Sequence, residues 1–254
     1  MPQLVAVRRA RIDDAGIIAD FADLRRHAYP AYSPVFWRPA PGARTHHLPF
    51  LQACLADGCH SAFVAEAAEG VVGAAVANYR VGVPPFTRDL EASGIASWLV
   101  DDFYVASQDW WRTAGGALLD SVAAAARSSG QNRLIVVSAE RDAPKNAMLR
   151  DRGFRQAAAW WVRPLELPTN PVPAEGERLP MLVGPAPPVY DPGGPVALAL
   201  DTTPPFAMDR FERQAAAAEA VLAVVPVRMA DRTLAEGLAA AGYAVASVWW
   251  AREP

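Results

Sequence analysis

The stretch that decides the fold is Trp110–Leu119, "WWRTAGGALL", where a predicted strand gives way to a predicted helix. Two adjacent glycines, Gly115 and Gly116, stand where that helix begins. Glycines at such a position allow an anion to reach unpaired backbone amides, and they also allow the helix to pack closely on a neighbour. Taken alone, the stretch leaves both roles open.

Working outward, alternating apolar residues predict strands and apolar residues at helical spacing predict helices. Gly130 is a candidate C-terminal cap of one helix, and Asp142 is a candidate N-terminal cap of the next. The predicted order is strand 4–10, helix 11–29, helix 46–58, hairpin 61–81, strand 97–106, helix 116–130, strand 133–139, helix 143–152 and strand 154–165. We therefore expect an α/β (α+β) fold with a central mixed sheet flanked by helices.

Bulk composition narrows the class of protein. A chain of 254 residues builds a core without disulfides or metals, and its net charge of −3 provides no basic surface for nucleic acid. No window approaches the roughly 18 to 20 apolar residues of a membrane span. The charged start of the chain does not resemble a signal peptide, so we expect a cytoplasmic protein. Cys54 and Cys59 are interpreted as small buried residues, and no metal site is predicted.

Nine prolines between positions 164 and 192 mark a change in composition. A segment this rich in proline is stiff and extended, which is typical of a boundary. We predict a first domain at 1–165, a proline-rich linker at 166–194 and a smaller strand-helix-strand domain at 195–254.

The C-terminal domain aligns with the end of the first when the sequence is shifted by 89 positions. Residues 133–165 then lie over 222–254, and the pair Trp160-Trp161 falls on Trp249-Trp250. The second copy has no glycine between its strand and helix, so it cannot offer the same phosphate-binding loop. This difference favours the phosphate-binding role for the glycines of the first copy. The copy could extend the sheet, close a substrate site of the first domain or form a homodimer contact.

Arg112–Ala117, "RTAGGA", fits the pattern R-x-x-G-x-A, which resembles the pyrophosphate loop of the GNAT superfamily of acyl-CoA-dependent N-acetyltransferases. The order of the elements is also similar, over about residues 4–164. "DAPKNAMLRDRGF" resembles the late motif of that family. On this reading 1–165 is GNAT-like and 195–254 is a degenerate GNAT-like half-domain.

The resemblance implies that the protein binds acetyl-CoA or another acyl-CoA. Its pyrophosphate would meet the backbone amides of Arg112, Thr113, Ala114, Gly115, Gly116 and Ala117. The strand that contains Tyr104 and Val105 would pair with the pantetheine arm.

An amine must lose a proton before it attacks a thioester, so a nearby carboxylate is useful. "LVDDFYV" is similar to the acidic strand of polyamine acetyltransferases, which makes Asp101 the candidate base and Asp102 the candidate substrate anchor. Strand alternation puts the two on opposite faces unless a bulge intervenes. Each could instead face solvent or pair with an arginine.

The family's general-acid tyrosine falls on Leu149, which has no proton to donate. Tyr104, Tyr79, His46 and His47 are substitutes by residue type alone, and water is a further possibility. The loop at 30–45 usually shapes the acceptor pocket in this family. Its aromatic residues and their neighbour, Tyr29, Tyr32, Phe36 and Trp37, either line a substrate or cover the core.

We therefore expect an N-acyltransferase that moves an acyl group from acyl-CoA to an amine of a small molecule, by direct attack in a ternary complex. The alternative is a non-catalytic acyl-CoA-binding or assembly protein of the same fold, which Leu149 motivates. A third reading is decarboxylation or hydrolysis of an acyl-CoA.

Overall fold

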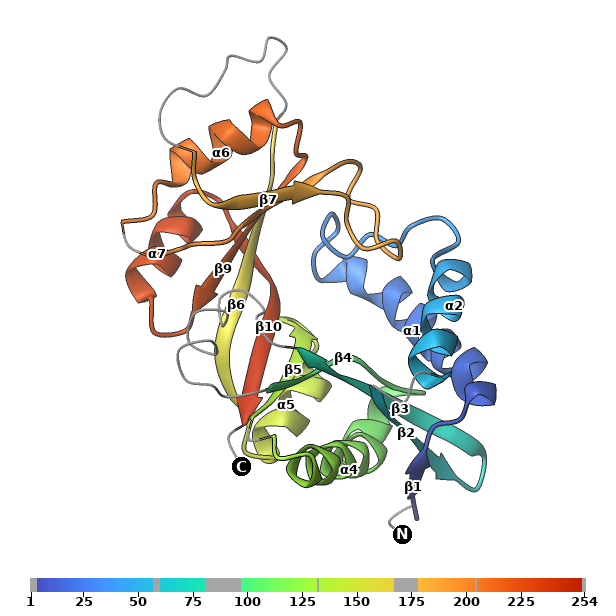
Figure 1. Cartoon of the computed structure of the whole chain (residues 1–254). Coiled ribbons are helices and arrows are strands. Elements are labelled where there is room, and N and C mark those ends of the chain that lie inside the picture. The colour runs from blue at the N-terminus through green and yellow to red at the C-terminus, as the bar shows by residue number, and fades with distance from the viewer. Residues whose placement is uncertain are drawn as a thin grey trace.

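The computed structural model of the protein describes residues 4–56, 60–80, 97–131, 133–166, 178–203 and 205–252. Within these ranges a mixed sheet of ten strands is flanked by six helices (Figure 1). The predicted α+β class with a mixed sheet is therefore confirmed. None of the described helices has the length and apolar character needed to cross a membrane. Cys54 is buried as predicted, and Cys59 lies outside the described residues.

The strands run in the order β1-β2-β3-β4-β5-β10-β6-β9-β8-β7 across the sheet. Their bounds are β1 (Ala6–Arg9), β2 (His60–Ala67), β3 (Gly70–Arg80), β4 (Ser97–Val105), β5 (Arg133–Ala139), β6 (Arg155–Pro164), β7 (Met181–Gly184), β8 (Val196–Ala199), β9 (Leu222–Arg228) and β10 (Ala244–Arg252). The pairs β4/β5 and β8/β9 are parallel, and the other neighbours are antiparallel.

The helices are α1 (Ala15–Ala28), α2 (Ala43–Ala56), α4 (Ala114–Ser128), α5 (Ala143–Asp151), α6 (Met208–Ala217) and α7 (Arg232–Ala240). Helices α1 and α2 lie on one face of the first strands and α4 lies on the other (Figure 1). A short 3-10 turn, Gln108–Trp111, connects β4 to α4. The Asp142 side chain caps α5 as predicted.

The end of the chain returns to the middle of the sheet. Strand β10 lies between β5 and β6, so the last strand of each predicted copy pairs with the other copy. The two pairings have the same register under the 89-residue offset. Ala158 aligns with Ser247 and Ala139 aligns with Arg228. Accordingly, Ser247 faces Ala139 in the β10–β5 pair, and Ala158 faces Arg228 in the β6–β9 pair. The sheet is thus continuous across the predicted linker, which itself contributes β7. The repeat and the domain boundaries stay predictions.

Candidate active site

A β-bulge in β4 brings the two candidate acids to one face of the sheet. The pairing with β3 skips Asp101, because Val100 and Asp102 face consecutive residues of β3. Val100 and Phe103 both belong to the core beneath α4. The two residues between them, Asp101 and Asp102, therefore both leave that core toward the face of α1 and α2. Strand alternation is expected to separate the two acids unless a bulge intervenes, and the register of β4 shows such a bulge.

Asp102 is held by two side chains. The Tyr104 hydroxyl donates a hydrogen bond to Asp102 Oδ1, and His47 Nε2 on α2 lies 3.4 Å from the same oxygen. Burial alone would raise the pKa of Asp102, but His47 and Tyr104 outweigh it and hold this pKa below its usual value. Burial and the Asp102 charge raise the pKa of Tyr104 well above its usual value. Asp102 is therefore ionised and Tyr104 protonated near neutral pH.

The tautomer of His47 follows from its other neighbour. Arg26 Nη1 lies 3.3 Å from His47 Nδ1, and a guanidinium can only donate. Nδ1 is therefore the acceptor, which assigns the proton of a neutral ring to Nε2, the nitrogen that faces Asp102. Arg26, His47 and Asp102 thus form one polar chain from α1 through α2 to β4.

Strands β4 and β5 separate beyond the bulge and form a fork. Their parallel pairing ends at Val100, although both strands continue. Backbone carbonyls on each side of the fork are already bound by basic side chains of the protein. Arg25 Nη1 donates to the Phe103 carbonyl on β4, and Lys145 Nζ donates to the Val137 carbonyl on β5 over 2.7 Å.

An ion pair extends across the mouth of this fork. Arg25 Nη2 on α1 lies 2.7 Å from Asp142 Oδ2 at the start of α5, and the Tyr29 hydroxyl donates to the same oxygen over 2.9 Å. Lys145 is 1% exposed, and its Nζ lies 5.5 Å from the centre of the Trp111 ring. The chain's own side chains thus fill the fork.

The two glycines of α4 are in close contact with neighbouring side chains. A Cβ atom at Gly115 would lie 2.7 Å from Cε3 of Trp111, and one at Gly116 would overlap the guanidinium of Arg152. Arg152 Nη1 also donates to the Gly116 carbonyl over 3.1 Å. Gly115 is therefore required for packing against the Trp111 ring, whereas a Cβ at Gly116 would meet the end of a flexible side chain that can move.

This packing contradicts the inference that the predicted repeat favours a phosphate-binding role for the two glycines. Arg152 aligns with Ala241 under the 89-residue offset, and Trp111 belongs to the segment that the second copy lacks. The copy has lost the packing partners as well as the glycines. Its lack of glycines therefore does not favour a phosphate-binding loop over close packing.

The start of α4 nevertheless keeps features that suit an anion. Thr113 stands at the N-cap position without a side-chain cap hydrogen bond. Arg112 is exposed beside it, and Ala114 is buried while Ala117 is half-buried. Unpaired amides at a helix start and two arginines, Arg112 and Arg152, could hold a diphosphate. Across the described ranges, no three His, Cys, Asp or Glu side chains gather closely enough to hold a metal ion.

The predicted aromatic residues form a cluster at the end of β5. Tyr29 and Trp37 are buried with ring centres 5.1 Å apart, while Tyr32 and Phe36 are half-buried. Tyr190, from the predicted linker, lies with its ring centre 5.3 Å from that of Trp37. The cluster covers the core, and it also borders the fork, since Tyr29 bonds Asp142.

Other predicted positions lie as follows. Val105 is half-buried against the core beneath α4, His46 is exposed, and Leu149 is fully buried in that core. The side chain of Tyr79 lies outside the described residues.

Sequence reasoning missed several residues that meet at this site. These are Arg25, Arg26, Asp142 as an ion-pair partner, Lys145 and Tyr190. The sequence carries one signal, since Asp142 and Lys145 stand where the late motif of the GNAT superfamily has an asparagine and an alanine. Nothing in the local sequence marks the other three, because long-range contacts bring them to the site.

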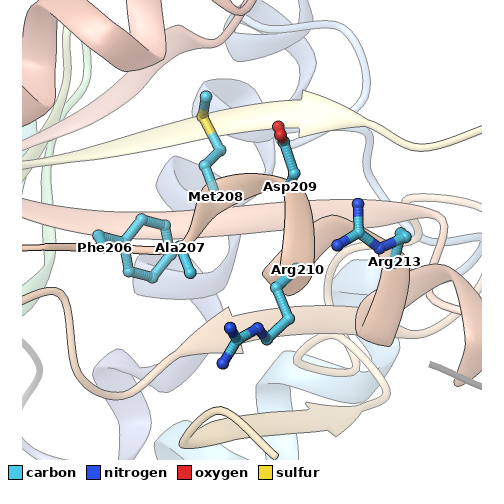
Figure 2. A pocket seen from close by; sticks show the side chains of 6 residues that line it. All are labelled: Phe206, Ala207, Met208, Asp209, Arg210 and Arg213. Carbon is cyan, nitrogen blue, oxygen red and sulfur yellow. The ribbon is translucent and has the colours of Figure 1, made fainter. Parts of the chain in front are cut away.

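A separate hollow of about 390 Å³ lies at the start of α6 (Figure 2). Its lining residues are Phe206, Ala207, Met208, Asp209, Arg210 and Arg213. None of the predicted site residues contributes to it.

No family model matches the sequence, and no curated protein matches it. Solved structures share part of the fold. One is a protein described as a predicted acetyltransferase, with acetyl-CoA, from Clostridium acetobutylicum, at 12% identity and a TM-score of 0.46 over 60% of this chain and 90% of that one. Another is a ribosomal-protein-alanine N-acetyltransferase from Brucella melitensis, at 15% identity and a TM-score of 0.41 over 59% and 90%. An N-acetyltransferase from Staphylococcus aureus matches at 14% identity and a TM-score of 0.47 over 62% and 87%. These similarities concern the fold of about three fifths of the chain, at low identity.

Proposed function

We propose that this protein is an acyl-CoA-dependent N-acyltransferase, with acetyl-CoA as the simplest donor and an amine of a small molecule as the acceptor. The observation that supports it most is the bulge in β4. The bulge gathers Asp101 and Asp102 on one face, beside the fork and shortly before the glycine start of α4. Two carboxylates at this position can bind an ammonium group and accept its proton.

The two acids have different surroundings and hence different proposed roles. Asp101 is the more exposed of the two, which suits a group that accepts a proton from the amine, directly or through water. Asp102 stays ionised beside His47 and Tyr104, which suits a group that attracts and orients the ammonium form. Tyr104 is protonated, but its hydroxyl hydrogen is donated to Asp102, so it would have to leave that carboxylate to serve another group.

The donor would supply an acyl group activated as a thioester. The amides at the start of α4, together with Arg112 and Arg152, are the groups that would hold its diphosphate. Tyr104 and Val105 lie on the strand that borders the fork, where the arm of the donor would lie. Arg25 and Lys145 bind the carbonyls there, so they would have to move for that arm to enter.

Isothermal titration calorimetry with acetyl-CoA tests the diphosphate site. Arg112→Glu places a negative charge at the start of α4 and is expected to weaken binding about tenfold or more. Arg127→Glu, at an exposed position near the end of the same helix, is the matched control and should leave affinity nearly unchanged. No binding to the wild-type protein, or equal losses in both variants, would overturn the proposed donor site.

Release of coenzyme A thiol, followed with and without a panel of primary amines, tests the transfer itself. We expect release that depends on the amine and yields the N-acyl product in equal amount. Release without any amine would favour hydrolysis or decarboxylation of the acyl-CoA.

A second candidate is a non-catalytic acyl-CoA-binding or assembly protein of the same fold. Two observations favour it: Leu149 is buried where the family has a tyrosine, and the fork is filled by Arg25 and Lys145. Acetyl-CoA binding without turnover of any amine would support this candidate and contradict the transferase.

A further inference from the structure

Arg26 is a buried cation with an incomplete set of partners. Its side chain on α1 is 3% exposed. Within the described part of the chain, Nε and Nη2 are buried and have no hydrogen-bond acceptor, while Nη1 reaches His47. An unpaired buried donor is costly, and a charged one costs more, so these two nitrogens call for an acceptor.

The two unpaired nitrogens lie side by side on one edge of the guanidinium group. The N–H of Nε and one N–H of Nη2 run parallel along one edge of the guanidinium plane. That edge matches the two oxygens of a carboxylate, which it binds by two parallel hydrogen bonds. The missing partner is therefore expected to be a carboxylate rather than a single carbonyl.

The carboxylate of Asp23, one turn earlier on α1, does not fill this role. Asp23 Oδ1 lies 3.7 Å from Nη2, beyond hydrogen-bond distance, and its side chain is 29% exposed. Asp102 is close enough to interact electrostatically with Arg26, but His47 lies between them in the polar chain. The side-on edge of the guanidinium therefore has no carboxylate bound within the described chain, and a ligand would have to displace the side chains that cover its two buried nitrogens.

This edge belongs to the same polar chain as the candidate acids. Arg26 contacts His47, and His47 contacts Asp102 on β4. Tyr190 interacts electrostatically with both Arg26 and Asp101, so the two charges lie in the same region of the protein. A molecule that reached the two acids with a cationic group would thus find a fixed positive charge nearby.

We propose that Arg26 binds a carboxylate of the acceptor, so that the acceptor is an amine that also carries a carboxylate, as an amino acid does. This inference rests on the proposed function. The acids receive the amine and Arg26 receives the carboxylate, so that the two charges of the acceptor fix its orientation.

Matched pairs of acceptors test the proposal. Each pair consists of an amino acid and the amine that lacks its carboxylate: alanine and ethylamine, phenylalanine and 2-phenylethylamine, tryptophan and tryptamine. We expect kcat/KM to favour the amino acid about tenfold or more in the pair that reacts. A wild-type protein that prefers the amines, or that treats both members alike, would overturn the inference and leave the transferase standing.

Variants of Arg26 assign the preference to this side chain. Arg26→Met should abolish it, and Arg26→Lys should lose most of it because an ammonium lacks the parallel pair of donors. Arg44→Met is the control, since Arg44 is an exposed arginine on α2 that pairs with Asp20. A preference that survives in Arg26→Met contradicts the proposal.

Direct binding separates this inference from the proposed function. If no amine is acylated, the transferase fails, but calorimetry with the same amino acids and amines still tests Arg26. Amino-acid binding that is lost in Arg26→Met and kept in Arg44→Met supports the carboxylate site. No binding of any amino acid at millimolar concentration overturns it.

A melting curve distinguishes a ligand-binding role from a structural one. The two unmet hydrogen bonds of Arg26 offset its contacts with Asp23 and His47, so Arg26→Met should melt at nearly the same temperature as the wild type or higher. A clear fall in melting temperature would mean that Arg26 holds the fold together, and would contradict its assignment as a site that awaits a ligand.

Discussion

Arg25 and Asp142 are 117 positions apart in the sequence, yet Arg25 Nη2 and Asp142 Oδ2 lie 2.7 Å apart. Their side chains are 12% and 7% exposed, so the pair is largely withdrawn from water. It joins α1 to the start of α5, and the same guanidinium binds the Phe103 carbonyl on β4. One arginine thus connects both sides of the fork.

Asp142→Asn should destabilise the protein by about 3 kcal/mol, because it leaves the buried Arg25 without its counter-charge. Asparagine can still cap a helix, so the cap of α5 is largely retained. Asp231→Asn is the matched control: Asp231 aligns with Asp142 at the start of α7 but makes no side-chain cap hydrogen bond. Urea unfolding measures both. Similar small changes in the free energy of unfolding of the two variants would show that the ion pair contributes little to stability.

Lys145→Met should flatten the dependence of stability on pH. Burial, and then the charge of Arg25, lower the pKa of Lys145 well below its ordinary value of 10.5. The unfolded chain therefore binds this proton more tightly than the folded one. Wild-type stability rises with pH toward the unfolded pKa and falls as pH decreases, by up to about 1.4 kcal/mol per pH unit for one proton.

Urea unfolding of both proteins between about pH 7 and pH 9.5 measures this difference, because the titratable groups that the two proteins share cancel in the comparison. An unchanged slope would mean that Lys145 keeps its proton in the fold. The faces of Phe103 and Trp111, 5.2 and 5.5 Å from Nζ, would then be the groups that stabilise the charge.

Gly115→Ala should destabilise the protein by about 1–3 kcal/mol, because the new Cβ would meet the Trp111 ring at the start of α4. Gly237→Ala is the control in another helix. Nothing lies within 4 Å of a Cβ at position 237, so alanine there should stabilise α7 by about 1 kcal/mol. Chemical denaturation compares the two. Equal effects at both positions would contradict the close contact between Gly115 and Trp111.

Asp101→Asn should lower kcat for amine acylation by about 10² to 10⁴, because the amide cannot accept the proton of the amine. The loss should shrink at high pH, where more of the amine is already neutral. Asp109→Asn, at an exposed position in the turn before α4, should leave kcat unchanged. A full rate in Asp101→Asn would remove Asp101 from the proposed mechanism.

Asp102→Asn should act mainly through KM, because Asp102 is proposed to attract the ammonium form of the acceptor. The variant also removes the acceptor for the Tyr104 hydroxyl, so its stability should be measured in parallel. A loss confined to kcat, with KM unchanged, would contradict the anchoring role and assign the proton transfer to Asp102.

Local patterns were enough to predict the order and type of most elements. Alternation marked β4 and the β2–β3 hairpin, and helical spacing marked α1 and α4, because these periodicities follow from the geometry of each element alone. The cap at Asp142 is local for the same reason, since its side chain reaches only three residues ahead. Two acids on β4 were also evident as candidates from their residue types.

What the two acids can do together was decided by the tertiary structure. The bulge at Asp101 arises from how β4 pairs with β3, and no single-strand pattern contains that register. Arg25, Arg26 and Tyr190 reach the site through contacts between distant segments, which the local sequence does not encode. The position of β10 at the centre of the sheet likewise depends on which distant strands it pairs with. The sequence by itself determined the elements and the candidate chemistry, whereas only long-range packing decided which side chains meet at the fork.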